Sequence, residues 1–347
     1  MGIERTEQGP AGHHAALDRI MQIALGFQAS KVLLTAVRLG LFTELAAAPL
    51  PYEELRSRLG LHPRAARDFF DALVALGLLD RDERGYANTP AAARHLDRER
   101  AGYLGGFLEM ADARLYRFWD TLADGLRTGE PQNELKDGGE DFFGVLYQDP
   151  ERLAEFLRAI TGLSMRSAHA LADTVDWSAH RVVADIGCAE GGTLGHLLLR
   201  HPHLRGIGFD LEPVRPHFER RAERFGLADR LEFRGGDFFT DPLPHADVLV
   251  FGHILHDWDL PAKRMLLRKA YEALPAGGVV IVYETLVDDA RHANAPALLM
   301  SLNILIETTG GFDYTGSDCR EWLAEAGFAD SRVRPLAGAE SMVIARK

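Results

Sequence analysis

The second half of the chain alternates short β-rich runs with helical segments, and this alternation restricts the fold more than any other feature. After Trp177, five short runs typical of β-strands are separated by stretches of helical periodicity: RVVADIG, RGIGFDL, LEFRGGDFF, ADVLVFG and GGVVIVYE. Strands separated by helices form a parallel sheet with helices on both faces. Two more strands, FADSRVRPLAG and ESMVIARK, follow with only a short connection. We therefore predict a Rossmann-like α/β fold with a seven-stranded, mostly parallel sheet that ends in an antiparallel pair.

The first part of the chain is predicted to be mainly helical. Apolar residues such as Ile20, Ile23, Ala24 and Phe27 recur at helical spacing from Ala15 to about Leu45. The segments PYEELRSRLGL and HPRAARDFFDALVALGLL also predict helices, and DRDERGYANTP predicts a β-hairpin. One apolar stripe of this region contains Phe69, Phe70, Leu73, Leu76 and Leu79. Helices followed by a hairpin are the order of a winged helix-turn-helix unit.

The change of pattern along the chain predicts two domains. We place a winged-helix-like domain at residues 12–97 and the second domain at 98–347, which consists of a helical lead-in, 98–175, and a Rossmann-like core, 176–347. Residues 1–14 are expected to be a disordered lead-in. The helical lead-in is broken by glycines and by a loop from Pro131 to Gly139. Asp149 then caps a long helix that starts at Pro150 and carries the apolar stripe Leu153, Phe156, Leu157 and Ile160.

Charge and composition exclude several function classes. The chain has 51 acidic against 39 basic residues, a net charge of −12, so it repels phosphate backbones and we expect no nucleic-acid partner. Its two cysteines have no metal-ligand or disulfide spacing, which favours a reducing compartment. The polar start is not a secretory signal, and no uninterrupted run of 18 apolar residues is present. We predict a cytoplasmic protein without a membrane partner.

Chemically distinctive residues follow the predicted strands. Asp185 and Gly187 end the first strand, Asp210 ends the second, and Asp237 and Phe238 follow the third. Ligands of open α/β sheets bind at the carboxyl ends of strands, and an acidic residue after the second strand commonly holds ribose hydroxyls. A carboxylate beside an aromatic ring suits an adenine. The glycine motif of a nicotinamide site is absent, so the pattern predicts a different nucleoside cofactor site.

Together these motifs resemble a known family. The order D-I-G-x-x-x-G, FDL, GGDFF, HILHDWD, LPAGGVVIVYE and TGGFDYT is similar to that of the small-molecule O-methyltransferases of the caffeic-acid and bacterial natural-product type. The resemblance covers nearly the whole chain. It implies a class I methyltransferase fold, S-adenosylmethionine as co-substrate, no metal, and a homodimer formed through the N-terminal unit. The implied partner is a small aromatic acceptor whose hydroxyl is methylated.

The resemblance also implies roles for single residues. His256 matches the general base, and Glu284 and Asp313 match the acidic residues that flank it. An imidazole titrates near physiological pH and a carboxylate can fix its tautomer, so this set suits removal of a phenolic proton. The implied cofactor-binding positions are Asp185, Gly187, Asp210, Leu211, Asp237, Phe238 and Gly252. Asp185 is expected to organise the loop rather than to act in catalysis.

The sequence departs from the family pattern in the glycine loop and after the fourth strand. Cys188 and Ala189 replace glycines, and Glu190 adds a carboxylate whose role the sequence does not define. Gly252 stands where plant members have a lysine that contacts the cofactor, which puts that contact in doubt.

The resemblance places the acceptor pocket on two helices. The candidate residues are Ile160, Ser164, Met300, Asn303, Ile304 and Thr308. Core packing is an alternative for Ile304.

Four other hypotheses remain open. His253 and His256 could form a metal pair, although a packed or solvated His253 is favoured. The same scaffold could methylate nitrogen or carbon, or could bind the cofactor without catalysis. A winged helix also suggests a DNA-binding regulator, but Arg64 and Arg67 are accompanied by Asp68 and Asp71 on the candidate recognition helix.

Overall fold

The computed structural model describes residues 10–100, 102–137 and 146–347. It divides into two compact units, Met1–Asp112 and Ala113–Lys347, whereas the sequence placed the boundary between residues 97 and 98. Residues 10–14 already belong to a helix, so the predicted disordered lead-in is wrong for them, and its first nine residues lie outside the described part of the chain. The loop predicted at Gly138 and Gly139 also lies outside it.

The first unit consists of helices and one small hairpin. Its elements are α1 (Pro10–Ala24), α2 (Gly26–Arg38), α3 (Leu41–Glu44), α4 (Tyr52–Arg58), α5 (Pro63–Ala75), β1 (Leu79–Asp82), β2 (Gly85–Asn88), α6 (Pro90–His95) and α7 (Gly105–Met110). The hairpin predicted from the sequence is present, with β1 antiparallel to β2. The winged-helix assignment rests on the order of these elements and stays a prediction.

The core of the first unit contains most of the predicted apolar stripe. Phe70, Leu73 and Leu79 are buried together with Phe42 and Tyr86. Leu76 is 45% exposed, against the prediction, because it caps the C-terminus of α5, beyond the last helical turn that faces this core.

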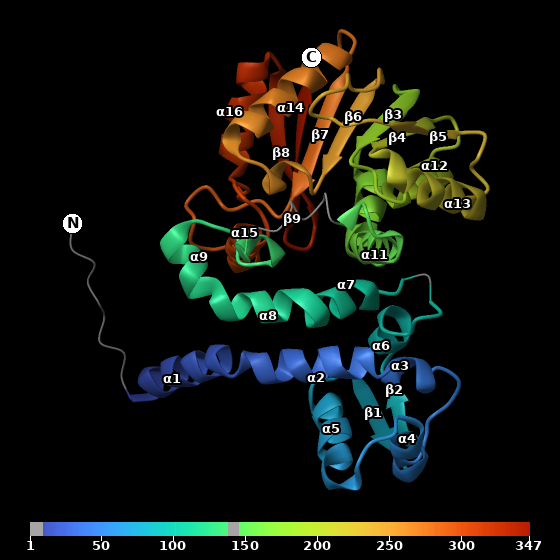
Figure 1. Ribbon diagram of the computed structural model, residues 1–347, viewed down its shortest axis with the longest axis vertical. Helices are drawn as coiled ribbons and strands as arrows, with labels where there is room; N and C mark the ends of the chain where they lie inside the picture. Colours follow the sequence, from blue (N-terminus) through green and yellow to red (C-terminus); the bar gives the residue numbers. More distant parts are fainter. Residues whose placement is uncertain (1–9, 101, 138–145) are drawn as a thin grey trace. The chain divides into compact units, whose positions relative to one another are not determined.

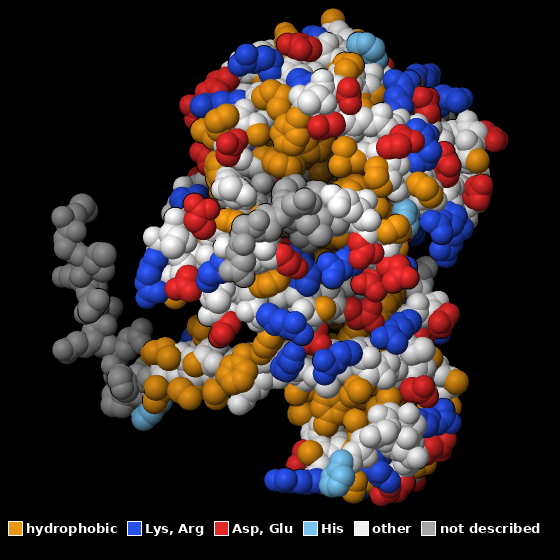
Figure 2. Space-filling model, in the orientation of Figure 1, with side chains coloured by type: hydrophobic (Ala, Val, Ile, Leu, Met, Phe, Trp, Pro, Cys, Tyr) orange, Lys and Arg blue, Asp and Glu red, His pale blue; other side chains and the backbone are white. Residues whose placement is uncertain are grey.

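The apolar face of α1 and the start of α2 is exposed in the single chain. Figure 2 shows hydrophobic side chains gathered along this segment; those exposed are Leu17, Ile20, Met21, Ile23, Leu25 and Phe27. By length and composition alone, His14–Arg38 is one helical segment that could cross a membrane. Within the same unit, however, the buried carboxylate of Asp112 pairs with Lys31 and Arg38 of this segment.

The second unit contains the predicted seven-stranded sheet (Figure 1). Its strands are β3 (Val182–Ile186), β4 (Arg205–Asp210), β5 (Leu231–Gly235), β6 (Val248–Gly252), β7 (Val279–Glu284), β8 (Ala329–Ala337) and β9 (Glu340–Arg346). They lie in the order β5-β4-β3-β6-β7-β9-β8. The strands from β3 to β7 pair in parallel, and β9 is antiparallel to both β7 and β8. The predicted topology, including the antiparallel end, is confirmed.

Helices pack on both faces of this sheet. The long α11 (Pro150–Thr174) packs with α12 (Gly192–Arg200) and α13 (Arg215–Phe225) on one face. The helices α14 (Leu260–Ala273) and α16 (Gly316–Ala326) cover the other. Other α-helices among the described residues of this unit are α8 (Tyr116–Phe118), α9 (Leu122–Thr128) and α15 (Ala295–Glu307). The Asp149 side chain accepts hydrogen bonds from the first turn of α11, which confirms the predicted cap.

The order of the strands determines where a ligand can bind. The chain leaves β3 toward β4 on one side and later returns to β6 on the other, so β3 and β6 flank the switch point. In open α/β sheets a crevice forms outside the carboxyl ends of such a pair. The loop after β3 begins at Gly187 and the segment after β6 leads to His256, so both groups of candidate residues meet at this edge.

Candidate active site

His256 lies in a 3-10 turn, Leu255–Asp257, directly beyond β6. Its side chain is only 9% exposed, and its Nδ1 lies 3.2 Å from Oδ1 of Asp313. A carboxylate at Nδ1 holds the proton on that nitrogen, which leaves Nε2 as the basic atom. Asp257 Oδ1 is 3.6 Å from Nε2. The ring of His256 is therefore held by a carboxylate. A histidine with only a structural role at this position would need no more than hydrogen bonds to its backbone.

Glu284 supports the same histidine through its backbone. Oε1 of this carboxylate accepts a hydrogen bond of 3.1 Å from the His256 backbone N–H. Donor and acceptor atoms of His256, Glu284 and Asp313 all lie within 4.8 Å of one another, and all three residues are buried. The two carboxylates that the sequence placed beside the base thus have different contacts: Asp313 holds the ring, and Glu284 holds the main chain.

Electrostatics of this cluster favour protonated His256 in the unliganded chain. Burial by itself lowers the pKa of His256, but the carboxylates of Glu284, Asp257 and Asp313 outweigh it and raise that pKa to about 10. Burial raises the pKa of Glu284 to about 7, while the charge of His256 opposes the shift. A neutral imidazole at pH 7 requires additional positive charge near this cluster.

The loop after β3 requires glycine at its first position. Gly187 has a φ of +74°, and a Cβ there would lie 2.2 Å from Cδ1 of Ile254.

Asp210 fixes the next part of the loop. Its Oδ2 accepts the backbone N–H of Ala189 at 2.9 Å, and its Oδ1 accepts that of Leu211 at 2.8 Å. The Asp210 carboxylate therefore holds the backbone of this loop in place.

Glu190 anchors this loop to two helices. Its Oε2 accepts a hydrogen bond of 3.2 Å from the Thr161 hydroxyl on α11 and pairs with the guanidinium of Arg221 on α13. The neighbouring Cys188 is buried in the core that α11, α12 and α13 form with the sheet. The departures from the family's glycine pattern thus add packing and an ion pair to the loop.

Gly252 has no space for the lysine of the plant enzymes. It is opposite Tyr283 in the β6–β7 register, and a Cβ at Gly252 would come within 2.1 Å of the Tyr283 ring. The Tyr283 hydroxyl lies 3.3 Å from that of Thr193 at the start of α12. A tyrosine from the next strand therefore occupies the position that a longer side chain at residue 252 would take.

Two buried carboxylates suit a cationic ligand at the crevice. Asp185 is 5% and Asp210 7% exposed. Burial, with a contribution from Asp210, raises the pKa of Asp185 to about 7, and burial raises the pKa of Asp210 to about 6. A positively charged ligand would offset the cost of burying both charges. S-adenosylmethionine, a cationic nucleoside, fits these two carboxylates.

The residues after β5 form an aromatic wall. Phe238 contacts Trp258 edge to face, with ring centroids 5.8 Å apart. The Asp237 carboxylate accepts the backbone N–H of Phe239 at 2.8 Å and remains partly exposed.

The predicted acceptor residues divide into two groups. In α15, Ile304 is buried, and the Thr308 hydroxyl donates to the Ile304 carbonyl while accepting the N–H of Gly311, so both have structural roles. Asn303 accepts a hydrogen bond of 3.0 Å from the Trp119 indole. The others are half-buried: Met300 on α15, and Ile160 and Ser164 on α11. Helix α15 packs beside the turn that carries His256.

The metal-pair interpretation of His253 has little support in its surroundings. Its ring packs edge to face on Tyr283, with centroids 5.3 Å apart, and its Nε2 lies 3.6 Å from a Glu340 carboxylate oxygen. Burial lowers its pKa to about 3, so this ring is neutral. It is a partly buried histidine packed on Tyr283.

Sequence reasoning missed two residues near the crevice. The Tyr147 hydroxyl donates to Oδ1 of Asp210 at 3.3 Å, and no motif indicated it. Lys263 is completely buried on α14. A signal for it was present, because Lys263 is on the same helical stripe as Leu266, Leu267 and Ala270.

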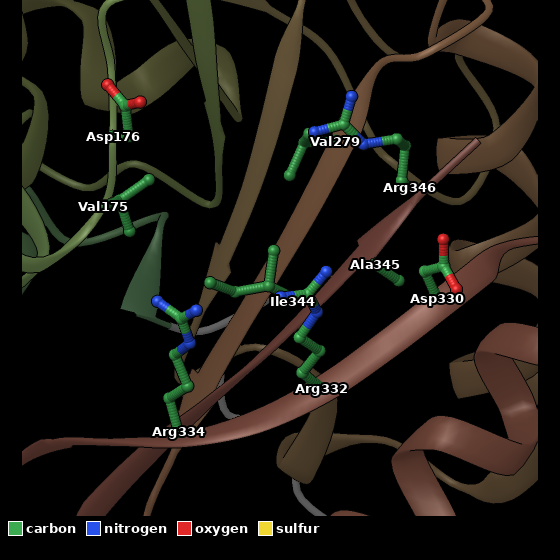
Figure 3. A pocket seen from close by; sticks show the side chains of 9 residues that line it. All are labelled: Val175, Asp176, Val279, Asp330, Arg332, Arg334, Ile344, Ala345 and Arg346. Carbon is green, nitrogen blue, oxygen red and sulfur yellow. The ribbon is translucent and has the colours of Figure 1, made fainter.

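A separate hollow of about 180 Å³ lies at the other end of the sheet (Figure 3). It is lined at its base by Val279, the first residue of β7, whereas Glu284 is the last. The other lining residues are Val175, Asp176, Asp330, Arg332, Arg334, Ile344, Ala345 and Arg346. It is therefore distinct from the crevice at His256.

Comparison with known proteins agrees with this geometry. Residues 119–329 match the O-methyltransferase domain family, and residues 21–98 match the O-methyltransferase dimerisation domain. The chain belongs to the O-methyltransferase family. It is 44% identical to the tetracenomycin polyketide synthesis 8-O-methyl transferase TcmO of Streptomyces glaucescens, over 97% of this chain and 99% of that protein. It is an S-adenosylmethionine-dependent methyltransferase.

Two further relatives bear on the fold and the reaction. The crystal structure of human N-acetylserotonin methyltransferase in complex with S-adenosylmethionine superposes with a TM-score of 0.88 at 27% identity, covering 100% of this chain and 99% of that chain. The N,N-dimethyltransferase OxyT of Streptomyces rimosus is 37% identical over 91% of this chain and 90% of that protein. One relative of this chain is therefore named for methyl transfer to nitrogen.

Proposed function

We propose that this methyltransferase acts on a hydroxyl of a small aromatic natural product, with His256 as the general base. The observation that carries the proposal is the contact between His256 Nδ1 and Asp313, which leaves Nε2 as the nitrogen that can take a proton inside a buried site, 3.6 Å from Asp257 Oδ1. The relationship to TcmO, named as an 8-O-methyl transferase, supports oxygen as the methyl acceptor.

The protein contributes positioning and proton transfer. Asp313 keeps the proton of the neutral ring on Nδ1, and Glu284 holds the main chain of His256 in place. Nε2 takes the phenolic proton, and the resulting imidazolium is stabilised by the adjacent carboxylates. When bound, S-adenosylmethionine supplies an activated methyl group on a positively charged sulfur. Holding acceptor and donor in line contributes up to ~7–11 kcal/mol in well-oriented systems.

The cofactor site is proposed at the crevice between β3 and β6. Asp210 would accept hydrogen bonds from ribose hydroxyls, with Leu211 beside it, and Asp237 and Phe238 would hold the adenine. Gly187 allows close approach of the loop backbone, and Asp185 faces the cationic part of the ligand. Gly252 contributes no side chain, and Tyr283 fills its place. No step of this scheme uses a metal.

Half-buried residues are the better candidates for the acceptor pocket. We propose that Met300, Ile160 and Ser164 line it, with Asn303 at its edge. Ile304 is buried, and Thr308 follows the last residue of α15, where its hydroxyl is bonded to the Ile304 carbonyl.

Product analysis tests oxygen against nitrogen transfer. We expect the purified enzyme to methylate a panel of polycyclic phenols at oxygen and to leave the matching aryl amines unmodified, measured by mass spectrometry with isotopically labelled S-adenosylmethionine. A neutral imidazole can remove the proton of a phenol, which makes its oxygen a better nucleophile. An amine already has a free lone pair, so a site built around a base gives it no such advantage. Transfer to the amines alone, favoured by the kinship with OxyT, would replace this proposal with N-methylation.

We also propose a homodimer formed through the dimerisation domain, which ends near residue 98. The exposed apolar side chains of α1 and α2 form a continuous face that a second copy would cover. Obligate dimers bury large apolar surfaces, often over about 2,000 Å². The predictions of a cytoplasmic location, and of no nucleic-acid or membrane partner, stay predictions.

Charged substitutions on this face should convert the dimer to a monomer. We expect the wild-type chain to be a dimer at micromolar concentration by light scattering, and Ile20→Asp/Ile23→Asp to be monomeric, because a dimer would bury these unpaired charges. A matched control is Leu199→Asp, which places the same charge on an exposed leucine of α12. A monomeric wild type, or a dimeric double variant, would contradict the proposal.

A further inference from the structure

The hollow at the other end of the sheet contains three arginines that the proposed function does not use. Arg332 and Arg334 lie on β8, and Arg346 lies on β9 (Figure 3). Alternate residues of a strand point to the same face of a sheet. Arg332 pairs with Ile344 in the β8–β9 register, and Ile344 is two residues before Arg346, so all three arginines share one face. The hollow is therefore a single surface formed by neighbouring strands.

The three guanidinium groups have no partner in the protein. Across the described part of the chain, no carboxylate oxygen lies within 4.0 Å of them, and none of them makes a hydrogen bond. Exposed arginines elsewhere do form such pairs: Nε of Arg200 lies 3.0 Å from Asp173. The N–H donors of the three arginines are thus available to an anion.

Two carboxylates reduce the positive charge of the hollow without cancelling it. Asp176 and Asp330 also line it, and Figure 3 shows them on opposite sides of the arginines. Oδ1 of Asp176 already accepts hydrogen bonds of 3.0 and 2.7 Å from the backbone N–H and the hydroxyl of Ser178. Three cations against two anions leave an excess of positive charge, on a chain whose net charge is −12. The local field therefore favours an anion here.

The hollow also has an apolar part. Val175, Val279 and Ile344 line it together with the arginines. Its volume of about 180 Å³ is larger than the ~150 Å³ of a cavity that holds benzene. The hollow therefore has room for a ring-sized apolar group beside an anionic one.

Protection of the sheet edge explains only part of this arrangement. Charged side chains on an edge strand prevent pairing with a second sheet, and β8 is an edge strand of this sheet. Arg346, however, lies on β9, which has a neighbouring strand on each side. Edge protection also requires no apolar surface beside the charges. A ligand accounts for the arginines of both strands and for the apolar residues.

We propose that this hollow binds the phosphate group of a small phosphorylated organic molecule. Arg332, Arg334 and Arg346 donate to the phosphate, and the apolar residues contact the organic part. Guanidinium groups bind phosphate through paired N–H donors. A phosphate monoester has three terminal oxygens, one for each guanidinium, whereas a carboxylate has only two. The number of arginines therefore favours phosphate over carboxylate.

Calorimetry with phenyl phosphate as the probe tests the proposal. The titration is made at low salt with S-adenosylhomocysteine saturating the crevice, so that binding at the cofactor site does not contribute. We expect phenyl phosphate to bind about tenfold more tightly than benzoate, which has the same ring on a carboxylate. We also expect it to bind about fivefold more tightly than inorganic phosphate, which has no apolar part.

Each comparison can contradict one part of the proposal. Equal affinity for benzoate would overturn the choice of phosphate, and equal affinity for inorganic phosphate would overturn the contact with the apolar residues. If phenyl phosphate does not bind, edge protection alone explains the arginines and the proposal is wrong.

Substitution of the arginines locates the bound probe. We expect Arg332→Gln/Arg334→Gln and Arg346→Gln each to weaken phenyl phosphate binding by about tenfold, with unchanged affinity for S-adenosylhomocysteine. The matched control, Arg224→Gln/Arg268→Gln, removes two exposed arginines from α13 and α14 and should bind the probe like the wild type. Equal losses in control and test variants would reduce the effect to net charge and overturn the site. Unchanged affinity in the test variants would place the probe elsewhere and overturn it as well.

A measurement on the wild type covers the case in which a variant does not fold. Phenylglyoxal modifies accessible arginines, and mass spectrometry gives the rate at each one. At twice its Kd, phenyl phosphate should slow the modification of Arg332, Arg334 and Arg346 by about threefold and leave Arg224 and Arg268 unaffected. Equal rates with and without the probe would overturn the proposal. This readout involves no methyl transfer, so its outcome is independent of the proposed function.

Discussion

His256→Ala is expected to lower kcat by about 10²–10⁴-fold at neutral pH while the affinity for S-adenosylhomocysteine stays unchanged. Only about a thousandth of a phenol with a pKa near 10 is ionised at pH 7 without a base. Turnover of the variant should recover partly as the pH rises toward the pKa of the acceptor, because solvent then removes the proton. Stopped assays across pH 6–10 and calorimetry with S-adenosylhomocysteine measure the two effects.

Variants around the base refine this expectation. Asp313→Asn and Glu284→Gln should each cost less than His256→Ala, because they support the histidine without taking the proton. The carboxylates raise the pKa of His256 to about 10, so its neutral form becomes more populated as pH rises, and wild-type kcat should increase with pH through the neutral range. His292→Ala, at a side chain that is 76% exposed, is the control and should be silent. Near-normal turnover of His256→Ala at pH 7 would contradict the role of His256 as general base. Positioning of the two reactants would then account for the catalysis.

Asp210→Ala should weaken S-adenosylmethionine binding by about 1–3 kcal/mol, the cost of losing hydrogen bonds to a charged group. This corresponds to a roughly 5- to 150-fold higher Kd. The carboxylate would hold the ribose, and it also holds the backbone N–H groups of Ala189 and Leu211. Calorimetry of the purified variant gives the Kd directly.

Asp210→Asn separates the two roles of this carboxylate. The amide keeps the size of the side chain and one acceptor oxygen, so the loop should be better preserved than in Asp210→Ala, and thermal unfolding followed by circular dichroism shows whether it is. Asp229→Asn, at an exposed position, is the matched control. Unchanged affinity in both Asp210 variants would remove Asp210 from the cofactor site.

Much of the fold could be predicted because it depends on local patterns. Alternating β-rich and helical runs after Trp177 predicted the seven-stranded sheet, including the antiparallel end formed by β8 and β9. Asp149 and Pro150 predicted the start of α11, and a glycine turn predicted the hairpin of β1 and β2. In each case, short-range sterics and hydrogen bonding at neighbouring residues determine the result.

The exposed face of α1 shows where such patterns are insufficient. Ile20 and Ile23 have helical periodicity, yet they are 62% and 68% exposed in the single chain. Periodicity identifies an apolar face, but it does not say whether the same chain or another copy covers that face.

The sequence alone predicted the sheet and the glycine loop, because strand periodicity and motif spacing are properties of the chain. The candidate active residues came from the resemblance of its motifs to the O-methyltransferases, and their roles stay predictions. Only the tertiary structure decided how these residues act on one another. It brought Asp313 to the ring of His256 and Glu284 to its backbone, and placed the Tyr283 ring where a side chain at residue 252 would be. These contacts join residues on different strands and loops, and their geometry and electrostatics depend on the packing of the whole domain.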